Sequence, residues 1–170
     1  GLLPKRVTLP PRPDYIPAWT SMGADERRLA ARQMEAFAAE LSHADHEFGR
    51  ILDELRRQGR LDDTLVLVLS DNGASGEGGP GGTFNEWASI SGVPPTLQQN
   101  LAHYEDWGGP STYPHYAVGW AMAGNTPFKY YKTMVHAGGV RGPMVVSWPA
   151  GMAAHGELRG QLHHFIDVMP

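Results

Sequence analysis

The most regular hydrophobic pattern in the chain runs from about residue 24 to residue 58. Apolar residues recur there at alternating steps of three and four: Met34, Phe37, Leu41, Ala44, Phe48, Ile51 and Leu55. That spacing places them along one face, so the segment predicts a long amphipathic helix. Asp25 and Glu26 suit its N-terminal end, and Gly59 can cap its C-terminal end. Because the segment is longer than most helices, we expect a break near Ser42.

Two shorter apolar runs predict strands. The run at 65–69 is uninterrupted, which is typical of a strand covered on both faces in the centre of a parallel sheet. The run at 143–149 predicts a second short buried strand that ends at a proline, and residues 163–170 are expected to lead into a helix. A helix followed by a buried strand is half of a βαβ unit, so the pattern predicts an α/β fold.

Two segments lack any lasting periodicity. Residues 1–20 contain five prolines, which predict an extended strap over the surface of the protein. Residues 73–124 are rich in glycine and aromatic residues. A loop of this length inside a compact domain is usually functional or an insertion, so we expect an irregular active-site region there.

Composition narrows the class of protein. The 170 residues suffice for one domain, and a hydrophobic share of 41% excludes wholesale disorder. The net charge of −4 favours neither a nucleic acid nor an anionic membrane as partner. The chain has no cysteine, which removes disulfides and a cysteine nucleophile, and no apolar run approaches the roughly 20 residues of a membrane span.

The two ends of the chain bear on whether the sequence is a piece of a longer protein. The first residues lack the ordered regions of a signal peptide, the chain begins without methionine, and it stops at "IDVMP". We therefore expect a piece of a longer protein. A cytoplasmic, periplasmic or secreted location and the oligomeric state stay open.

The first candidate for chemistry is Asp71-Asn72-Gly73, directly after the first predicted strand. Ligands of α/β sheets gather beyond the carboxyl ends of strands, and carboxylate and amide oxygens suit Ca²⁺ or Mg²⁺. Asn-Gly is also a common hairpin signal, so spacing alone leaves a turn and a metal ligand equally open. An EF-hand is excluded, because Gly82 stands where that loop requires a bidentate glutamate.

The glycines beyond this point formally match a dinucleotide-binding fingerprint. Gly76, Gly78 and Gly81 have the spacing, but the glycines of that motif open a helix. Here Pro80, Gly82 and a mixed aromatic stretch follow instead, so we attribute the match to glycine density.

Lysine and arginine are scarce beyond residue 63, where only four occur: Lys129, Lys132, Arg141 and Arg159. Lys132 lies among aromatic residues and glycines, and its ammonium group could meet an anionic oxygen. A solvated surface lysine is the alternative, and Lys129 is a rival. Arg141 is expected to pair with a carboxylate or a carbonyl in a structural role.

The histidines give weaker signals. His43, His46 and Glu47 resemble a metal cluster on a helix, but they lie off the apolar stripe and are expected to face solvent. A structural role is expected for His163 and His164.

Three segments together resemble the type I sulfatases, especially bacterial arylsulfatases. In family order they are "RQMEAFAAELSHADHEFGRILDELRRQGRLDDTLVLVLSDNGAS", "WAMAGNTPFKYYKTMVHAGGVRGPMVVSWPAG" and "HHFIDVMP". The resemblance covers nearly the whole chain and is weakest between residues 82 and 110. It implies the alkaline-phosphatase-like α/β fold, a sandwich with a mostly parallel sheet between helical layers.

The resemblance also implies a site with one divalent cation, normally Ca²⁺, with Mg²⁺ as the alternative. Asp71 and Asn72 match the second pair of metal ligands of the family. Lys132 matches the lysine that contacts the sulfate group, and its place six residues before Gly138 favours it over Lys129. His136 has no assigned role, and Ala137 replaces a glutamate that is common in the family.

The family nucleophile is a formylglycine made from a Cys/Ser-x-Pro/Ala-x-Arg motif, which residues 1–170 do not contain. The chain therefore resembles a central-to-late section of the catalytic domain, expected to be inactive by itself. The implied function is hydrolysis of a sulfate monoester of a small molecule or a glycan. A phosphonate or phosphodiester hydrolase, and a non-catalytic ion- or glycan-binding relative, are the alternatives.

Overall fold

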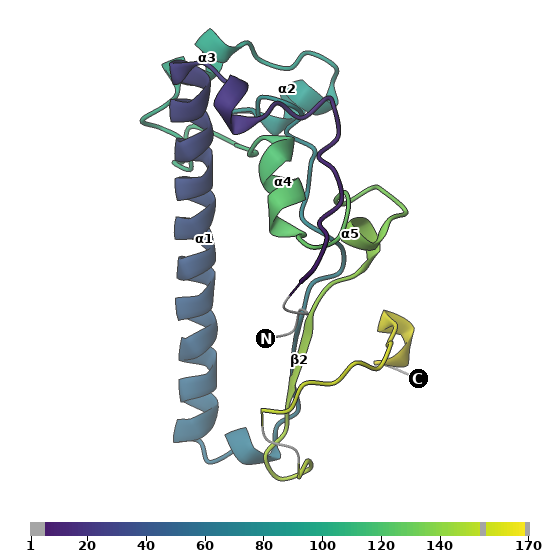
Figure 1. The fold of residues 1–170 in the computed structure, drawn as a ribbon. Helices are drawn as coiled ribbons and strands as arrows, with labels where there is room; N and C mark the ends of the chain where they lie inside the picture. The colour runs from purple at the N-terminus through teal and green to yellow at the C-terminus, as the bar shows by residue number, and fades with distance from the viewer. Residues whose placement is uncertain (1–5, 154–155, 169–170) are drawn as a thin grey trace.

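In the computed structural model, which describes residues 6–153 and 156–168, a long helix stands beside an irregular body and a two-stranded ribbon (Figure 1). The α-helices are α1 (Ala24–Arg57), α2 (Glu86–Ile90), α3 (Leu97–Ala102), α4 (Val118–Gly124) and α5 (Ala137–Val140). The strands are β1 (Val66–Leu69) and β2 (Met144–Ser147), and the 3-10 helices are η1 (Trp19–Ser21), η2 (Leu61–Asp63) and η3 (Phe165–Asp167).

The long helix that the apolar stripe predicts is confirmed as α1. Its start is fixed by the Glu26 carboxylate, which accepts a hydrogen bond from the backbone N–H of Gly23 at 2.6 Å. The break that we expected near Ser42 is wrong, because α1 is continuous. The Ser42 hydroxyl donates to the carbonyl of Ala38 at 2.8 Å, which satisfies the side chain without interrupting the helix.

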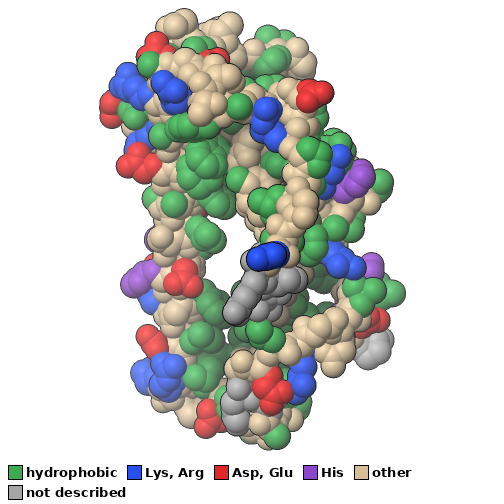
Figure 2. Space-filling model, viewed as in Figure 1, with side chains coloured by type: hydrophobic (Ala, Val, Ile, Leu, Met, Phe, Trp, Pro, Cys, Tyr) green, Lys and Arg blue, Asp and Glu red, His purple; other side chains and the backbone are tan. Residues whose placement is uncertain are grey.

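The fully buried residues of α1 lie in its N-terminal part. Leu29, Ala30 and Gln33 are buried, whereas Leu41 and Ile51 further along the predicted stripe are each 60% exposed. Figure 2 shows the open space between the C-terminal half of this helix and the ribbon. The stripe therefore predicts the helix correctly, but within the described residues its members are half-buried, as at Met34, Phe48 and Leu55, or exposed.

The ribbon confirms both predicted strands, but their pairing and their burial differ from the prediction. β1 pairs with β2 in antiparallel register, from Val66 opposite Ser147 to Leu69 opposite Met144. The parallel neighbour and the two-sided burial that we expected are not found among the described residues, where the sheet has these two strands and β2 is exposed throughout. A continuous apolar run indicates that both faces are hydrophobic, but it does not specify which strand pairs with it.

The buried core joins the strap, α4 and the segment before α5. Its buried members are Ile16, Val118, Ala121 and Tyr131, and the partly buried residues packed on them are Ala74, Tyr116, Met122, Tyr130 and Met134. Tyr15 and Tyr131 share a hydrogen bond of 2.7 Å between their hydroxyls, and burial together with this bond raises the pKa of Tyr15 to about 12. This core holds the residues after β1 against residues 130–134.

The predicted strap and the C-terminal segment are partly described. Residues 6–18 form neither helix nor strand, and residues 1–5 lie outside the described residues. At the other end the expected helix is one 3-10 turn, η3, in which the backbone N–H of Ile166 donates to Nδ1 of His164 at 3.3 Å. Residues 169–170 lie outside the described part. No described helix is long and apolar enough to cross a membrane.

Candidate functional site

The chain turns sharply after β1 and presents two oxygen donors. The Ser70 hydroxyl donates to the carbonyl of Asn72 at 2.7 Å, and the Asn72 amide nitrogen donates to the carbonyl of Gly73 at 3.1 Å. These bonds leave the Asn72 side-chain oxygen and the exposed Asp71 carboxylate without a hydrogen-bond partner among the described residues. An amide oxygen and a carboxylate in this state fit a hard divalent cation.

The hairpin alternative for Asn72-Gly73 is wrong. The strand that pairs with β1 is β2, which begins at Met144, so no second strand follows this turn directly. The abrupt turn instead brings Gly73 against the glycine pair of α5. Its backbone N–H donates to the carbonyl of Gly139 at 3.0 Å, and a Cβ at Gly73 would overlap the carbonyl oxygen of Gly138. Only glycine permits this contact between the two backbones.

Lys132 lies beside the same loop. Its backbone N–H donates to the carbonyl of Ala74 at 3.0 Å, and its ammonium group lies 2.8 Å from a carboxylate oxygen of Glu77. The ammonium of Lys129 lies instead 4.6 Å from the ring centre of Tyr130. The guanidinium of Arg141 lies 5.8 Å from the ring centre of Phe128, a contact different from the carboxylate or carbonyl that we expected.

Three residues that the sequence analysis did not single out surround Lys132. The Ser75 hydroxyl donates to the Lys132-bound oxygen of Glu77 at 2.8 Å, and the Nε2 atom of His115 lies 2.8 Å from the Ser75 hydroxyl. One feature of the sequence could have pointed to Glu77: it is the only charged residue among positions 73–82. His115 and Lys132 are 38 and 55 residues from Glu77 in the chain, so spacing could not reveal these contacts.

The ion pair shifts the pKa values of both partners. The hydrogen bond from Lys132, followed by the one from Ser75, lowers the pKa of Glu77 below its ordinary value. The hydrogen bond to Glu77 raises the pKa of Lys132. Both directions keep the pair charged near neutral pH.

Glu77, Glu86 and His115 form the one group of possible metal-binding side chains found among the described residues, with ligand atoms within 4.8 Å of one another. The ammonium group of Lys132 already occupies one Glu77 oxygen at 2.8 Å, and it would repel a second cation there. We therefore do not assign a metal to this group. The Asp71-Asn72 turn has no such competing bond among the described residues.

The histidines on α1 and near the C-terminus lie elsewhere. His43 and His46 are exposed on α1, as the apolar stripe predicts, and Glu47 forms an ion pair with Arg50 at 2.6 Å. His163 is exposed and His164 caps η3, which agrees with the structural role expected for that pair.

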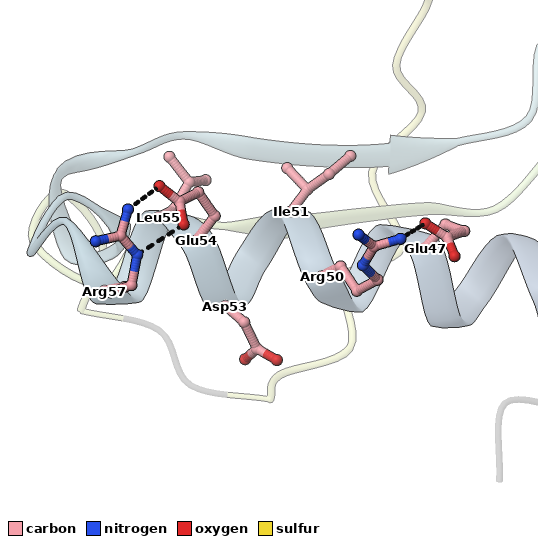
Figure 3. Close-up of a pocket in the computed structure, with 7 residues that line it drawn as sticks. All are labelled: Glu47, Arg50, Ile51, Asp53, Glu54, Leu55 and Arg57. Atoms are coloured by element: carbon pink, nitrogen blue, oxygen red, sulfur yellow. Dashed lines mark hydrogen bonds and ion pairs between the residues drawn. The ribbon is translucent and has the colours of Figure 1, made fainter.

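Two hollows border α1. The larger, about 1090 Å³, lies between the N-terminal half of α1, the loop at 72–75 and residues 113–116. The smaller, about 720 Å³, follows the last turns of α1 (Figure 3). Its charged groups include Glu54 and Arg57, which pair with each other at 2.6 Å, so we assign it no chemistry.

Comparison with known proteins gives a consistent answer. The family model described as Sulfatase matches residues 9–170. The chain is 30% identical over 151 residues to an uncharacterized sulfatase of Schizosaccharomyces pombe, across 88% of this chain and 26% of the yeast protein. It is 27% identical over 153 residues to an arylsulfatase of Klebsiella aerogenes, across 89% of this chain and 31% of that enzyme.

The chain thus spans 26% and 31% of the lengths of these two relatives. The family implies the alkaline-phosphatase-like α/β fold, of which the described helices and the antiparallel ribbon form a part. The match extends through the Asp-Asn turn, the lysine segment and the glycine pair of α5. The resemblance seen in the sequence is therefore confirmed, and the chain belongs to the sulfatase family.

Proposed function

We propose that this protein is a sulfuric ester hydrolase of the arylsulfatase type, acting on sulfate monoesters. One observation carries the proposal: the Asp71-Asn72 turn and Lys132 are held together by backbone hydrogen bonds. Gly73 donates to Gly139 and Lys132 donates to Ala74, each at 3.0 Å. Oxygen ligands that could hold a cation, together with a lysine ammonium, suit a tetrahedral anion such as a sulfate monoester, which the cation and the ammonium would neutralise from two sides.

Asp71 and Asn72 are proposed to hold the divalent cation, with Ca²⁺ as the first choice and Mg²⁺ as the alternative. A cation bound there would polarise the sulfate oxygens and lower the pKa of the nucleophile. The bond to Gly73 uses the amide nitrogen of Asn72 and leaves the amide oxygen available as a ligand. Asp71 supplies the negative charge.

Lys132 is proposed to contact the sulfate group. An ammonium group has three donors, and the bond to Glu77 uses one of them. The remaining donors can neutralise the charge on the transferring group as the ester bond breaks. We propose a formylglycine as nucleophile, contributed from outside residues 1–170, because these contain no Cys/Ser-x-Pro/Ala-x-Arg motif.

The substrate class is proposed to be a sulfate ester of a small molecule or a glycan. The name of the Klebsiella relative, an arylsulfatase, supports an aryl sulfate as the first compound to test. The alcohol part of the natural substrate is not specified by Lys132, Asp71 or Asn72, since all three face the anionic group in this proposal.

The test compares an aryl sulfate with an aryl phosphonate as substrates of the full-length protein, before and after removal of divalent cations by a chelator. We expect the larger kcat/KM for the sulfate, and we expect chelation to abolish turnover until Ca²⁺ or Mg²⁺ is restored. Dominant turnover of the phosphonate would reassign the protein to the phosphonate hydrolases. Metal binding without turnover of either compound would instead support a non-catalytic ion-binding relative.

A further inference from the structure

Lys132 is the end of a chain of polar side chains that the proposed reaction does not by itself require. Its ammonium group donates to Glu77 at 2.8 Å, Ser75 donates to the same Glu77 oxygen at 2.8 Å, and His115 contacts the Ser75 hydroxyl at 2.8 Å. The other ring nitrogen of His115, Nδ1, lies 3.0 Å from the carbonyl oxygen of Tyr116. Three separate segments of the chain thus meet in one network.

Each segment of this network is fixed by its backbone as well. Thr83 and His115 exchange two backbone hydrogen bonds of 2.8 Å, which anchor the histidine beyond the glycine tract. The N–H of Lys132 donates to Ala74, the residue before Ser75, at 3.0 Å. The side chains therefore extend from backbone that is already tied together.

Counting hydrogens shows how the network is completed. The Tyr116 carbonyl only accepts, so the Nδ1 atom of His115 donates to it. Nε2 of His115 lies 2.8 Å from the Ser75 oxygen, and that oxygen also accepts a hydrogen bond from the backbone N–H of Glu77 at 3.4 Å. The Ser75 hydroxyl is therefore held from two sides where it meets the Glu77 carboxylate.

The position of the lysine ammonium depends on this support. A lysine side chain is a flexible four-carbon stem, and the side chain of Lys132 is 35% exposed. Glu77 uses one donor of the ammonium and fixes its place, while the exposed side of the pair leaves the other donors open to an anion from solvent. A charge fixed before the substrate arrives needs no reorganisation during the reaction.

We propose that Glu77 is a positioning residue that holds the Lys132 ammonium for the sulfate group, and that Ser75 and His115 hold Glu77. This inference rests on the proposed contact of Lys132 with sulfate. The opposite role for Glu77 is that of an internal competitor, which occupies Lys132 until a substrate anion displaces it. The two roles differ in the sign of the effect when the carboxylate is removed.

The decisive experiment is a double-mutant cycle in the full-length protein with an aryl sulfate. Glu77→Gln keeps the size of the side chain, and we expect kcat to fall roughly 10- to 100-fold, as for a misplaced catalytic group, without a higher KM. Because Glu77 acts through Lys132, Glu77→Gln should change nothing further in the Lys132→Ala background. Glu54→Gln, which removes a more exposed ion pair with Arg57 on α1, is the control for loss of a glutamate charge and should leave kcat unchanged.

A higher kcat/KM in Glu77→Gln would show that the carboxylate competes with the substrate, and it would overturn the inference. A full additional loss in the Lys132→Ala background would also overturn it, since a merely structural role predicts that result. Should Glu77→Gln lower the melting temperature strongly, Ser75→Ala replaces it in the same cycle. That variant keeps the ion pair and should give a smaller fall in kcat that is likewise absent without Lys132.

A second readout does not require turnover. Acetylation of Lys132 by acetic anhydride, followed by peptide mass spectrometry, should be faster in Glu77→Gln because the amine loses its anionic partner. Lys129, whose ammonium lies over Tyr130, is the internal reference. An unchanged ratio of the two rates would overturn the inference. If instead Lys132→Ala leaves sulfate turnover unaltered, the proposed function of Lys132 fails, independently of whether Glu77 holds it.

Discussion

Asp71, which follows β1, and Lys132, which lies beside the same loop, are proposed to act on the sulfate group in different ways. Single substitutions should distinguish the two roles. Asp71→Ala removes an anionic cation ligand, so we expect the Ca²⁺ affinity of the full-length protein to fall at least about tenfold in calorimetric titration. Lys132→Ala should leave that affinity nearly unchanged and lower kcat by roughly 100-fold or more. Each variant serves as the control for the other. Unaltered Ca²⁺ affinity in Asp71→Ala would contradict the ligand assignment.

The Glu77–Lys132 ion pair should also give a pH dependence with a defined sign. The pKa of Glu77 is lowered by Lys132, so its stabilising effect is present above the ordinary glutamate value of about 4.3 and is lost as pH falls through the lowered pKa. The pKa of Lys132 is raised by Glu77. Its contribution to the stability of the folded protein is therefore complete below the ordinary lysine pKa of about 10.4 and is lost as pH rises through the raised pKa.

We therefore expect wild type to be slightly more stable than Glu77→Gln between these limits and the difference to vanish in acid. Thermal unfolding of both proteins across the pH range measures it. Because both side chains are about one-third exposed, solvent screening keeps the difference small. A difference that persists below the lowered pKa of Glu77, where its carboxylate is protonated, would show that the ion pair is not its source.

Residue types and local spacing were enough to select Asp71, Asn72 and Lys132 as candidate site residues, but not to assign a chemical role to each. Spacing alone left the turn and the ligand interpretations of Asp71-Asn72 equally open; the pairing of β1 with β2 excludes a hairpin there, and the role as metal ligands stays a proposal. Glu77 could not be linked to Lys132, because the contact joins residues 55 apart in the chain. Contacts of this kind depend on how the long loop closes, which local sequence does not encode.

At the scale of elements, the junction between the β1 turn and α5 can be tested with a matched pair of glycines. Gly73→Ala should displace the Asp-Asn turn and weaken Ca²⁺ binding, because the new Cβ would overlap the carbonyl oxygen of Gly138. Gly49 lies in α1, and no atom would come within 4 Å of a Cβ added there. Gly49→Ala should therefore stabilise the helix by about 0.5–1 kcal/mol. Chemical denaturation and calorimetry of both variants check this contrast. Normal Ca²⁺ affinity in Gly73→Ala would show that the junction does not position the ligands.

The attachment of α1 depends on Gln33, which is 1% exposed. Its amide nitrogen donates to the carbonyl of Gly81 at 2.8 Å, and its amide oxygen accepts from the N–H of Ala117 at 2.9 Å. Gln33→Leu would leave both backbone groups without these partners, so we expect a loss of about 2–6 kcal/mol in the free energy of unfolding, at about 1–3 for each group. Gln98→Leu, at an exposed position of α3, is the control. Equal effects of the two substitutions would contradict the role of Gln33 as an anchor.

Elements differ in how well their sequence predicts them. The stripe from Met34 to Leu55 was sufficient for α1, since helix periodicity is local, but the length argument for a break at Ser42 failed. Both strands were found from their apolar runs, yet neither the antiparallel pairing nor the exposure of β2 followed from them. The buried Gln33 could not be foreseen, because its partners lie 48 and 84 residues away.

For the whole molecule, we expect purified residues 1–170 to release no sulfate from an aryl sulfate. They contain no formylglycine motif, and Asp71 and Asn72 would supply only part of a cation shell. Release of sulfate is measured with and without Ca²⁺, and the full-length protein is the positive control. Metal-dependent release by residues 1–170 alone would contradict both the missing nucleophile and the incomplete shell.

The two hydrogen bonds at the junction, Gly73 to Gly139 and Lys132 to Ala74, have a consequence for the history of this protein family. They close the neck of the loop at 75–131, which carries α2, α3 and α4, so the parts of the site on either side of the neck are aligned outside this loop. Insertions and deletions between residues 88 and 111, away from the buried Asn100 and Trp107, can then accumulate without moving the turn or the lysine. We expect that stretch to diverge in length among relatives, so that new substrate preferences can evolve there while the chemistry at the neck is inherited intact.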